Sequence, residues 1–394
     1  MSQLEAPQVG LDRLLAELSP VATEPVELAQ AGGRVLGASI GADRDSPPFD
    51  ASAMDGFAMR VDDLSRLARL PIASEALIGQ IPAPLREGFA SRISTGSPLP
   101  PGADTVVRIE DLEVAAESVS LRPSAEPPSV GQHIRRRGEN LAAGSEVLAA
   151  GELLHAGAIA SLAAFHAGSC TVRRRVRVAV LITGNEVRHD LPPDAHSIRD
   201  SNGPAIRAAA SALPWVDLVE LTHVGDDLEQ TTAEMTRLLN SCDALITTGG
   251  VSMGQHDHVP SAAQRAGGRM IYHRLAMRPG KPNFAAVTPS GQPILSLPGN
   301  PVSVLCGWCR LVRPCLQALA GITQTAASPT LEVANPDGKT LDLWWYRLGH
   351  IDPAGRFTLQ PSRGSGDMAS AGPATGFIEQ PPRNPGHHGR YLAF

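Results

Sequence analysis

The sequence has few aromatic residues and no excess of positive charge. Phe, Trp and Tyr together make up 4% of its 394 residues, and the formal net charge is −6. Proteins that bind nucleic acid usually present a basic surface to the phosphates and aromatic side chains to the bases. We therefore expect no nucleic-acid partner.

Long apolar runs and a leader segment are also missing from the sequence. No stretch is long enough to span a bilayer, and residues 1–10 have neither the basic nor the apolar part of a secretory signal. The five cysteines, an odd number, do not build a disulfide framework. Cys306 and Cys309 have the spacing of a metal pair, but they fall in a segment that reads as a buried helix. We expect a cytoplasmic protein with core cysteines and no membrane partner.

The length of the chain predicts several domains, because 394 residues exceed what one hydrophobic core usually holds. Pro and Gly are frequent between residues 45 and 140, among short β-leaning runs, which predicts an inserted β-rich module. We expect an N-terminal helical and linker domain at 1–44 and 141–175, the β-rich module at 45–140, an α/β domain at 176–321, and a small, barrel-like C-terminal β domain at 322–394.

Strand-like and helix-like segments alternate within the α/β domain. Residues 176–182 form a run that is apolar except for Arg177 and rich in β-branched residues, which is typical of a buried parallel strand. The pattern predicts helices at 205–213 and 228–239, strands at 218–224 and 244–248, and a long helix that begins at Pro301. This order favours a central doubly wound, mostly parallel sheet with helices on both faces. Ligands of such sheets bind at the carboxyl ends of the strands.

The loops after these strands carry glycines and polar side chains. They are Thr183-Gly184-Asn185-Glu186, Gly225-Asp226-Asp227, Thr248-Gly249-Gly250-Val251-Ser252-Met253-Gly254, Arg278-Pro279-Gly280-Lys281-Pro282 and Leu297-Pro298-Gly299-Asn300-Pro301. Glycines let backbone N–H groups approach an anion, and helix N-termini add a favourable dipole. The acids of this region, Glu186, Asp200, Asp226, Asp227 and Asp257, would repel a phosphate unless a hard cation lay between them. We expect a site for phosphate or a metal oxyanion, with Mg²⁺.

Each of these loops also has a purely structural interpretation. The Gly250 to Gly254 segment reads equally as a tight turn, and Asp226-Asp227 is a common start for a helix. His256 and His258 do not share a helix face, so we expect no zinc site there. Recurrence of such loops after nearly every strand of one sheet nevertheless favours a functional face.

Several longer blocks of the sequence resemble one known family. They are Ser52-Ala53-Met54-Asp55-Gly56-Phe57-Ala58, Thr95-Gly96-Ser97-Pro98-Leu99-Pro100-Pro101-Gly102-Ala103-Asp104, Arg136-Arg137-Gly138-Glu139, Thr183-Gly184-Asn185-Glu186, Asp200-Ser201-Asn202, Thr248-Gly249-Gly250-Val251-Ser252, Pro279-Gly280-Lys281-Pro282 and Leu297-Pro298-Gly299-Asn300-Pro301-Val302-Ser303, with Gly364-Ser365-Gly366 as a fainter C-terminal match. On these blocks the chain resembles the molybdopterin molybdotransferases, called MoeA in bacteria and found as the E domain of gephyrin.

The resemblance implies a fold, a reaction and a partner. The central sheet would be like that of MogA and MoaB, within four subdomains of an elongated homodimer. The substrates would be adenylylated molybdopterin and molybdate, and the products molybdenum cofactor and AMP, with Mg²⁺ as the divalent cation. The site would lie between the α/β domain of one subunit and the module that carries Asp55 in the other.

The resemblance also implies the site residues. The catalytic set is Asp55, Thr95, Glu186, Asp226, Asp227, Asp257 and Lys281, of which Glu186, Asp226 and Asp257 would hold the metal. The substrate-binding set is Ser52, Arg137, Thr183, Gly184, Asp200, Ser201, Asn202, Gly249, Gly250, Ser252, Gly254, Arg278, Pro298, Gly299, Asn300, Pro301 and Ser303.

The chain departs from the family pattern at two acids and one lysine. Asn140 and Asn185 stand where acids are usual, which should weaken cation binding or mark a paralogue, and Arg278 replaces a frequent lysine. Two other functions remain open. One is molybdopterin adenylyltransferase, a sister family that lacks the β insertion, and the other is a catalytically weakened scaffold.

Overall fold

The computed structural model describes residues 4–166, 168–188, 195–251, 258–324 and 327–394. The chain divides into two compact units. We call the first, which comprises Met1–Ala38, Ala149–Ile159 and Ser169–Phe394, the α/β unit. The second, Ser39–Leu148 with Ala160–Gly168, is the β-rich unit. The segments expected as an α/β domain and a C-terminal β domain therefore lie in one compact unit.

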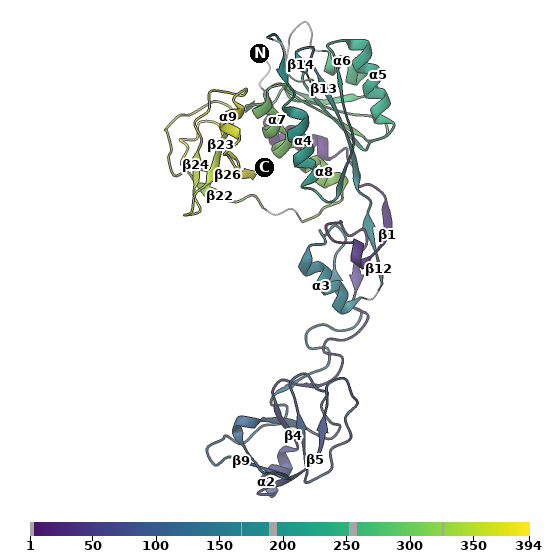
Figure 1. Ribbon diagram of the computed structural model, residues 1–394, viewed down its shortest axis with the longest axis vertical. Helices are drawn as coiled ribbons and strands as arrows, with labels where there is room; N and C mark the ends of the chain where they lie inside the picture. Colours follow the sequence, from purple (N-terminus) through teal and green to yellow (C-terminus); the bar gives the residue numbers. More distant parts are fainter. Residues whose placement is uncertain (1–3, 167, 189–194, 252–257, 325–326) are drawn as a thin grey trace. The chain divides into compact units, whose positions relative to one another are not determined.

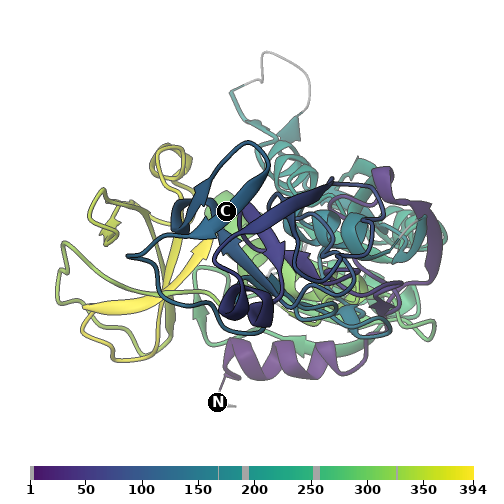
Figure 2. The ribbon, with the colours of Figure 1, turned by 90° about the horizontal axis from the view of Figure 1, so that it is seen from below.

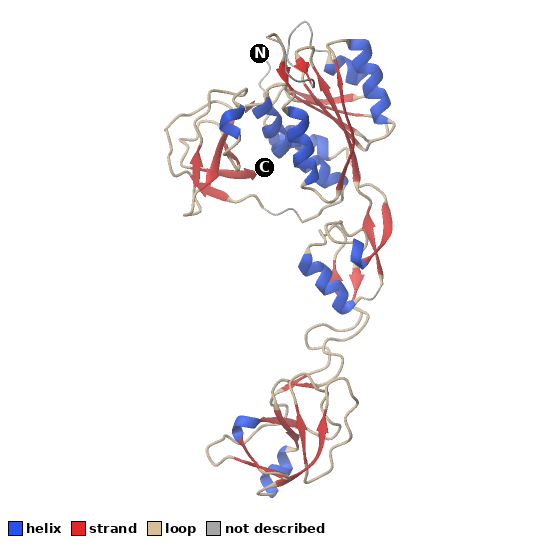
Figure 3. Cartoon of the chain, in the orientation of Figure 1, coloured by secondary structure: helices blue, strands red, loops and turns tan. Residues whose placement is uncertain are grey.

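The α/β unit is built on a central sheet that contains β13 (Figures 1 and 3). Its six described strands are in the order β16-β13-β17-β21-β20-β18. Their bounds are β13 Val176–Thr183, β16 Val216–Val224, β17 Ala244–Thr248, β18 Arg269–His273, β20 Phe284–Val287 and β21 Pro293–Leu297. The strands β16, β13, β17 and β21 pair in parallel, whereas β20 and β18 pair antiparallel. The prediction of a mostly parallel sheet is confirmed, and the antiparallel pair forms one edge.

Helices cover both faces of this sheet. Successive residues of a buried strand point to opposite faces, so the apolar side chains of each face have to be covered. Val178 and Val180 pack with one group of helices, whereas Ala179 and Leu181 pack with another. The first group is α4 (Asn202–Ser211), α7 (Pro301–Gly307) and α8 (Arg313–Leu319), and the second is α5 (Leu228–Leu239) and α6 (Val259–Arg265), as Figure 1 shows. The N-terminal helix α1 (Pro7–Leu15), purple beside the N-terminus in Figure 2, packs on β18, β20 and α8. The doubly wound arrangement is thus confirmed.

The long helix expected from Pro301 contains a π turn. Its segments are α7, η3 (Trp308–Val312, a π-helical turn) and α8. Pro314 in the first turn of α8 has no N–H and its ring would clash with the carbonyl of residue 310 in a regular α-helix. The π turn relieves this conflict, and the side chain of Arg310 within it is only 5% exposed.

A second sheet, at the C-terminal end, takes one short strand from the α/β domain. Its order is β19-β23-β25-β26-β22, with β24 beside β23. The bounds are β19 Met277–Arg278, β22 Thr330–Glu332, β23 Trp344–Ile351, β24 Phe357–Leu359, β25 Gly376–Gln380 and β26 His388–Ala393, and the short helix α9 spans Met368–Ala371. Arg278 of β19 lies in register with Trp345 of β23. The loop that carries Arg278 is therefore part of this sheet.

The β-rich unit holds a sheet in the order β7-β4-β6-β5-β9-β8. Its strands are β4 Gly56–Met59, β5 Leu70–Ala76, β6 Ala90–Ile93, β7 Thr105–Arg108, β8 Leu112–Val114 and β9 Ser118–Leu121, with α2 at Val61–Arg66. Shorter strands pair separately, β3 (Ala51–Ser52) with β10 (Ile134–Arg135) and β2 (Ile40–Gly41) with β11 (Glu146–Leu148). In the α/β unit β1 (Thr23–Glu27) pairs with β12 (Ser169–Arg173). The helix α3 (Ala156–Phe165) belongs to the α/β unit up to Ile159 and to the β-rich unit from Ala160. Within the described residues, no helix is long and apolar enough to cross a membrane.

Candidate functional site

The carboxyl ends of the parallel strands meet, as expected, at one edge of the central sheet. The Thr183 hydroxyl at the end of β13 donates a hydrogen bond of 3.1 Å to the carbonyl of Thr248 at the end of β17. The N–H of Gly249 then donates to the carbonyl of Leu297 at the end of β21, at 3.0 Å. These bonds hold three predicted loops together. We call residues 183–186, 225–227, 248–250 and 298–300 the strand-end face.

Gly249 must be glycine, because its backbone has a φ of +93° and lies close to β13. A Cβ at this position would come within 2.6 Å of both the carbonyl oxygen and the hydroxyl of Thr183. A Cβ on Gly299 would lie 3.5 Å from the Cα of Gly249. The glycines of these loops thus allow three backbone segments to approach one another.

The start of α4 is fastened to the same face. The Nδ2 of Asn202 donates a hydrogen bond of 2.9 Å to the carbonyl of Gly299, while its Oδ1 is buried without a partner. Asp200 accepts a bond of 2.9 Å from the N–H of Gly203, and Ser201 occupies the N-cap position of α4 without a side-chain cap bond. The Asp200-Ser201-Asn202 block therefore lies beside the Gly299 loop, as a shared binding role requires.

Two of the predicted acids lie near the end of β13. Asp226 Oδ2 accepts a hydrogen bond of 3.0 Å from the N–H of Asn185, and Asn185 Oδ1 accepts one of 3.1 Å from the N–H of Asp226. The Glu186 carboxylate folds back over Gly184, with Oε2 2.6 Å from where a Cβ on that glycine would stand. Asp227 has a structural role as the N-cap of α5, as expected for an aspartate before a helix. Its carboxylate accepts a hydrogen bond from the N–H of Gln230.

Three predicted site residues, Ser252, Gly254 and Asp257, lie outside the described residues. In the part of the chain that is described, no three His, Cys, Asp or Glu side chains gather into a metal-binding group. Of the three predicted metal ligands, only Glu186 and Asp226 therefore lie in the described part of the chain.

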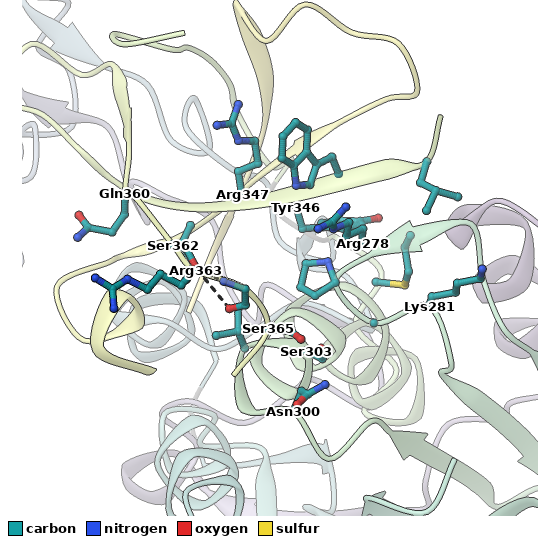
Figure 4. A pocket seen from close by; sticks show the side chains of 18 of the residues that line it. Arg278, Lys281, Asn300, Ser303, Tyr346, Arg347, Gln360, Ser362, Arg363 and Ser365 are labelled. Carbon is teal, nitrogen blue, oxygen red and sulfur yellow. Dashed lines mark hydrogen bonds between the residues drawn. The ribbon is translucent and has the colours of Figure 1, made fainter. Parts of the chain in front are cut away.

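A cavity of about 870 Å³ opens where the Arg278 loop, the start of α7 and the C-terminal sheet meet (Figure 4). Of the predicted residues, it is lined by Arg278, Lys281, Pro298, Asn300 and Ser303. Within the described residues, no carboxylate pairs with Arg278 or Lys281. We call this space the cationic cavity.

Sequence reasoning missed the wall that the C-terminal sheet contributes to this cavity. That wall includes Trp345, Tyr346, Arg347, Ser362, Arg363 and Ser365. Of these, only Ser365 had been noted, in the faint Gly364-Ser365-Gly366 match. Its carbonyl accepts a hydrogen bond of 3.0 Å from the N–H of Val302, so that block lies directly on the first turn of α7.

Arg347 is held in a fixed orientation at this wall. Its guanidinium donates two hydrogen bonds, of 2.9 and 2.7 Å, to the two carboxylate oxygens of Asp337. The same group lies over the ring of Trp345, 4.3 Å from the ring centre. The hydrogen bonds from Arg347 lower the pKa of Asp337 from 3.8 to about 2, so the carboxylate stays charged at neutral pH. Arg347 is thereby oriented before any ligand arrives.

The loop before α7 joins the cavity to the strand-end face. Pro298 and Asn300 line the cavity, while Gly299 between them lies against Gly249 and accepts from Asn202. Asn300 is the N-cap residue of α7 and Pro301 occupies the first turn, as predicted, but the Asn300 side chain makes no cap bond. An anion in the cavity would thus lie next to a ligand on the strand-end face.

The remaining predicted residues lie in the β-rich unit. Asp55 Oδ1 accepts a hydrogen bond of 2.7 Å from the N–H of Thr95, and the buried Ser52 hydroxyl donates to the carbonyl of Met54 at 2.6 Å. Gly56 is required for packing, because a Cβ there would lie 2.0 Å from the carbonyl oxygen of Val107. Asp55 and Thr95 lie together because β4 pairs with β6, in the register that places Gly56 opposite Ile93.

Arg137 has two acidic partners within the β-rich unit. Its side chain donates to Asp45, and its backbone N–H donates to Asp50 at 2.9 Å, which lowers the pKa of Asp50. The charge of Arg137, predicted to bind substrate, is therefore paired with Asp45 within its own unit.

Comparison with known proteins agrees with this geometry. Residues 7–165 match the MoeA N-terminal region (domains I and II), and residues 179–318 match a probable molybdopterin binding domain.

The molybdopterin molybdenumtransferase of Synechococcus elongatus is 34% identical over 92% of this chain and 91% of its own. Molybdopterin molybdenumtransferase 2 of Mycobacterium tuberculosis is 35% identical over 80% of each chain. The crystal structure of the molybdopterin biosynthesis MoeA protein from Pyrococcus horikosii, 26% identical, superposes with a TM-score of 0.78 over 99% of this chain and 97% of that one. Because the two family models together cover most of the chain and relatives at least 30% identical cover most of its length, the chain belongs to the MoeA family.

Proposed function

We propose that this protein is a molybdopterin molybdotransferase, which inserts molybdate into adenylylated molybdopterin and releases AMP. The observation that carries the proposal is the shared loop at 298–300, with the cationic cavity on one side and the strand-end face on the other. A reaction between an oxyanion and a nucleotide-activated pterin needs two such neighbouring sites. The names of the relatives support the same activity.

In this proposal molybdate occupies the cationic cavity. Arg278 and Lys281 approach from the α/β side and Arg347 from the C-terminal sheet. The positive charges of Arg278 and Lys281 would offset the dianion. The guanidinium of Arg347, whose charge is paired with Asp337, would fix the position of the dianion through its remaining N–H donors. The Ser303 hydroxyl, on the first turn of α7, would add a neutral donor.

The activated pterin occupies the strand-end face. Backbone N–H groups of the glycine loops would face its phosphates, as they do in other sheets of this type. The buried, unpartnered Oδ1 of Asn202 would accept a hydrogen bond from a ligand N–H. Asn202 would thereby bind the substrate and brace the Gly299 loop at the same time.

The acids present fit a magnesium ion. Glu186 and Asp226 place two carboxylates around Gly184 and Asn185, and Mg²⁺ usually takes one or two carboxylates together with water and substrate phosphates. When bound, the ion would offset phosphate charge and polarise a water for release of AMP. Glu186 and Asp226 would hold it, and Asp257 would be their third partner.

We further propose that the enzyme is a cytoplasmic homodimer, in which Asp55 and Thr95 of one subunit serve the site of the other. All five cysteines are free and buried, as suits a reducing compartment. A mixture of D55N and K281A subunits tests the shared site, because one site of each mixed dimer would retain both groups. Each variant alone should be inactive, and mixing should restore about a quarter of the activity, the random share of intact sites. Activity that stays absent after mixing would contradict a shared site.

The function itself is tested by AMP release from purified protein with adenylylated molybdopterin, Mg²⁺ and molybdate. We expect release that depends on molybdate, with tungstate as a comparison of oxyanion preference. Consumption of ATP with metal-free molybdopterin would instead identify an adenylyltransferase. Absence of AMP release with either oxyanion would contradict the proposed activity and favour a scaffold.

A further inference from the structure

A buried polar cluster connects Tyr346, on the wall of the cationic cavity, to the interior of the α/β unit. The Glu379 carboxylate of β25 accepts hydrogen bonds of 2.8 Å from Nε of Arg310 and from the hydroxyl of Tyr346, both at Oε1. Its Oε2 forms an ion pair of 2.6 Å with Arg390 of β26. Arg310 donates in addition to Gln8 of α1, at 2.8 Å. The π turn, β23 and β26 thus meet at the carboxylate of Glu379.

The members of this cluster are removed from water. The side chains of Arg310 and Glu379 are each 5% exposed, and Tyr346 is buried, which raises the pKa of its hydroxyl well above 10. Buried charges are costly unless they are paired and hydrogen-bonded, and such pairs often stabilise a fold less than apolar residues of equal size would. A role in positioning accounts for the cluster better than a role in stability.

What the cluster positions is strand β23. Side chains alternate along a strand, so Tyr346 points to the buried side, whereas Trp345 and Arg347 share the other side and contact each other. Tyr346 is attached through Glu379 to Arg310 in the π turn, whose helix begins at Ser303 and Asn300 on the cavity. The position of Arg347 relative to the start of α7 therefore depends on this connection.

The same connection also affects Arg278, on the α/β side of the cavity. The strand β23 pairs with β19, in the register that places Arg278 beside Trp345. A shift of β23 on the π turn would move Arg347 and the Arg278 loop together, away from Ser303. The geometry of the oxyanion-binding groups is thus coupled to a carboxylate that does not line the cavity.

We propose that Glu379 is a positioning residue for oxyanion binding, acting through Arg310 and Tyr346 to hold β23 against the π turn. The inference rests on the proposed function, since it takes the cationic cavity as the site of the oxyanion. It predicts that loss of the cluster weakens oxyanion binding in a protein that remains folded.

The first test is the binding of molybdate alone to the full chain, measured by calorimetry. Glu379→Gln keeps the size of the side chain but removes the charge that offsets Arg310. We expect the Kd for molybdate to rise on the order of ten- to a hundredfold, as when a remote change misplaces binding groups. Asp342→Asn is the matched control, because it removes an exposed ion pair with Arg383 in the same part of the chain and should leave the Kd unchanged.

Two further variants separate positioning from stability. Tyr346→Phe removes only the hydroxyl, leaves Arg310 paired with Glu379, and should raise the Kd severalfold even if Glu379→Gln fails to fold. The double variant R310M/E379M removes the two charges that are each 5% exposed and leaves unpaired only Arg390, whose side chain is 38% exposed. It should therefore recover most of the thermal midpoint without recovering the affinity. In the turnover assay KM for molybdate should rise while kcat changes little.

Folded Y346F and R310M/E379M proteins that bind molybdate with the original Kd would overturn the positioning role of Glu379 and leave the proposed function intact. If the unmodified chain binds no molybdate, the proposed function fails, and the positioning role fails with it.

Discussion

The side-chain amide of Asn202 donates a hydrogen bond of 2.9 Å to the carbonyl of Gly299, 97 residues later in the chain. This bond joins the start of α4 to the loop before α7 and so connects two of the blocks that the family shares. The loop has Gly249 on one side and the cationic cavity on the other. Its position decides how the two proposed substrates meet.

Replacement of Asn202 by Ala should weaken both the fold and substrate binding. The Gly299 carbonyl would lose its partner, so we expect the free energy of unfolding to fall by about 1–2 kcal/mol in urea titrations. The affinity for the adenylylated pterin should also decline. Ser211→Ala, which removes an exposed hydroxyl from the same helix, is the control and should change neither quantity.

Gly249→Ala should be strongly destabilising, since it adds both backbone strain and a clash with Thr183. We expect a loss of about 2–4 kcal/mol in the free energy of unfolding. Gly291→Ala is a matched control, because Gly291 has a similar φ of +83° but open space around it, and should cost about 1 kcal/mol. Equal losses in the two variants would show that the contact with Thr183 is unimportant.

Removal of the Arg347 side chain should affect the oxyanion specifically. Because a hydrogen bond to a charged group contributes about 1.5–3 kcal/mol, we expect Arg347→Ala to raise KM for molybdate about ten- to hundredfold. The KM for the pterin substrate should change far less. Arg356→Ala removes an exposed arginine of the neighbouring turn and serves as the control. An unchanged KM for molybdate in R347A would place the oxyanion elsewhere.

The pair of Asp337 with Arg347 should make stability depend on acid pH. The folded-state pKa of Asp337, about 2, lies below the ordinary value of 3.8. Its contribution to stability is therefore present above about pH 4 and is lost as the pH falls towards 2. The difference in free energy of unfolding between the unmodified chain and Asp337→Asn should be constant from pH 5 to 7 and shrink below pH 4. A constant difference down to pH 2.5 would contradict this linkage.

Asn185→Asp should restore a carboxylate that the family usually has. Asn185 Oδ1 already accepts from the N–H of Asp226, so an aspartate can keep that bond while adding charge beside Asp226. We expect the Mg²⁺ concentration for half-maximal AMP release to fall severalfold. Asn140→Asp, in the β-rich unit where Asn140 accepts from Arg135, provides the comparison. A higher magnesium requirement in N185D would mean that the added charge repels Asp226 more than it attracts the cation.

The sequence by itself determined the central sheet and its functional edge. Mostly apolar runs such as 176–182 and 244–248 are recognisable because a buried parallel strand has no exposed face, and the amphipathic run at 228–239 coincides with α5. Glycine and polar blocks after these strands marked the strand-end face, because parallel topology brings strand ends to one edge. The family blocks then indicated the chemistry.

Only the tertiary structure decided how the cavity is completed and which acids are already engaged. Arg347 is 69 residues from Arg278 in the sequence, and no periodic pattern predicts that β19 leaves the α/β domain to pair with β23. Asp226 and Asp227 are adjacent in the sequence, yet one bonds Asn185 and the other caps α5. Local patterns specify strands and helices, whereas contacts between distant segments depend on how those elements pack, and that packing determined the cationic cavity.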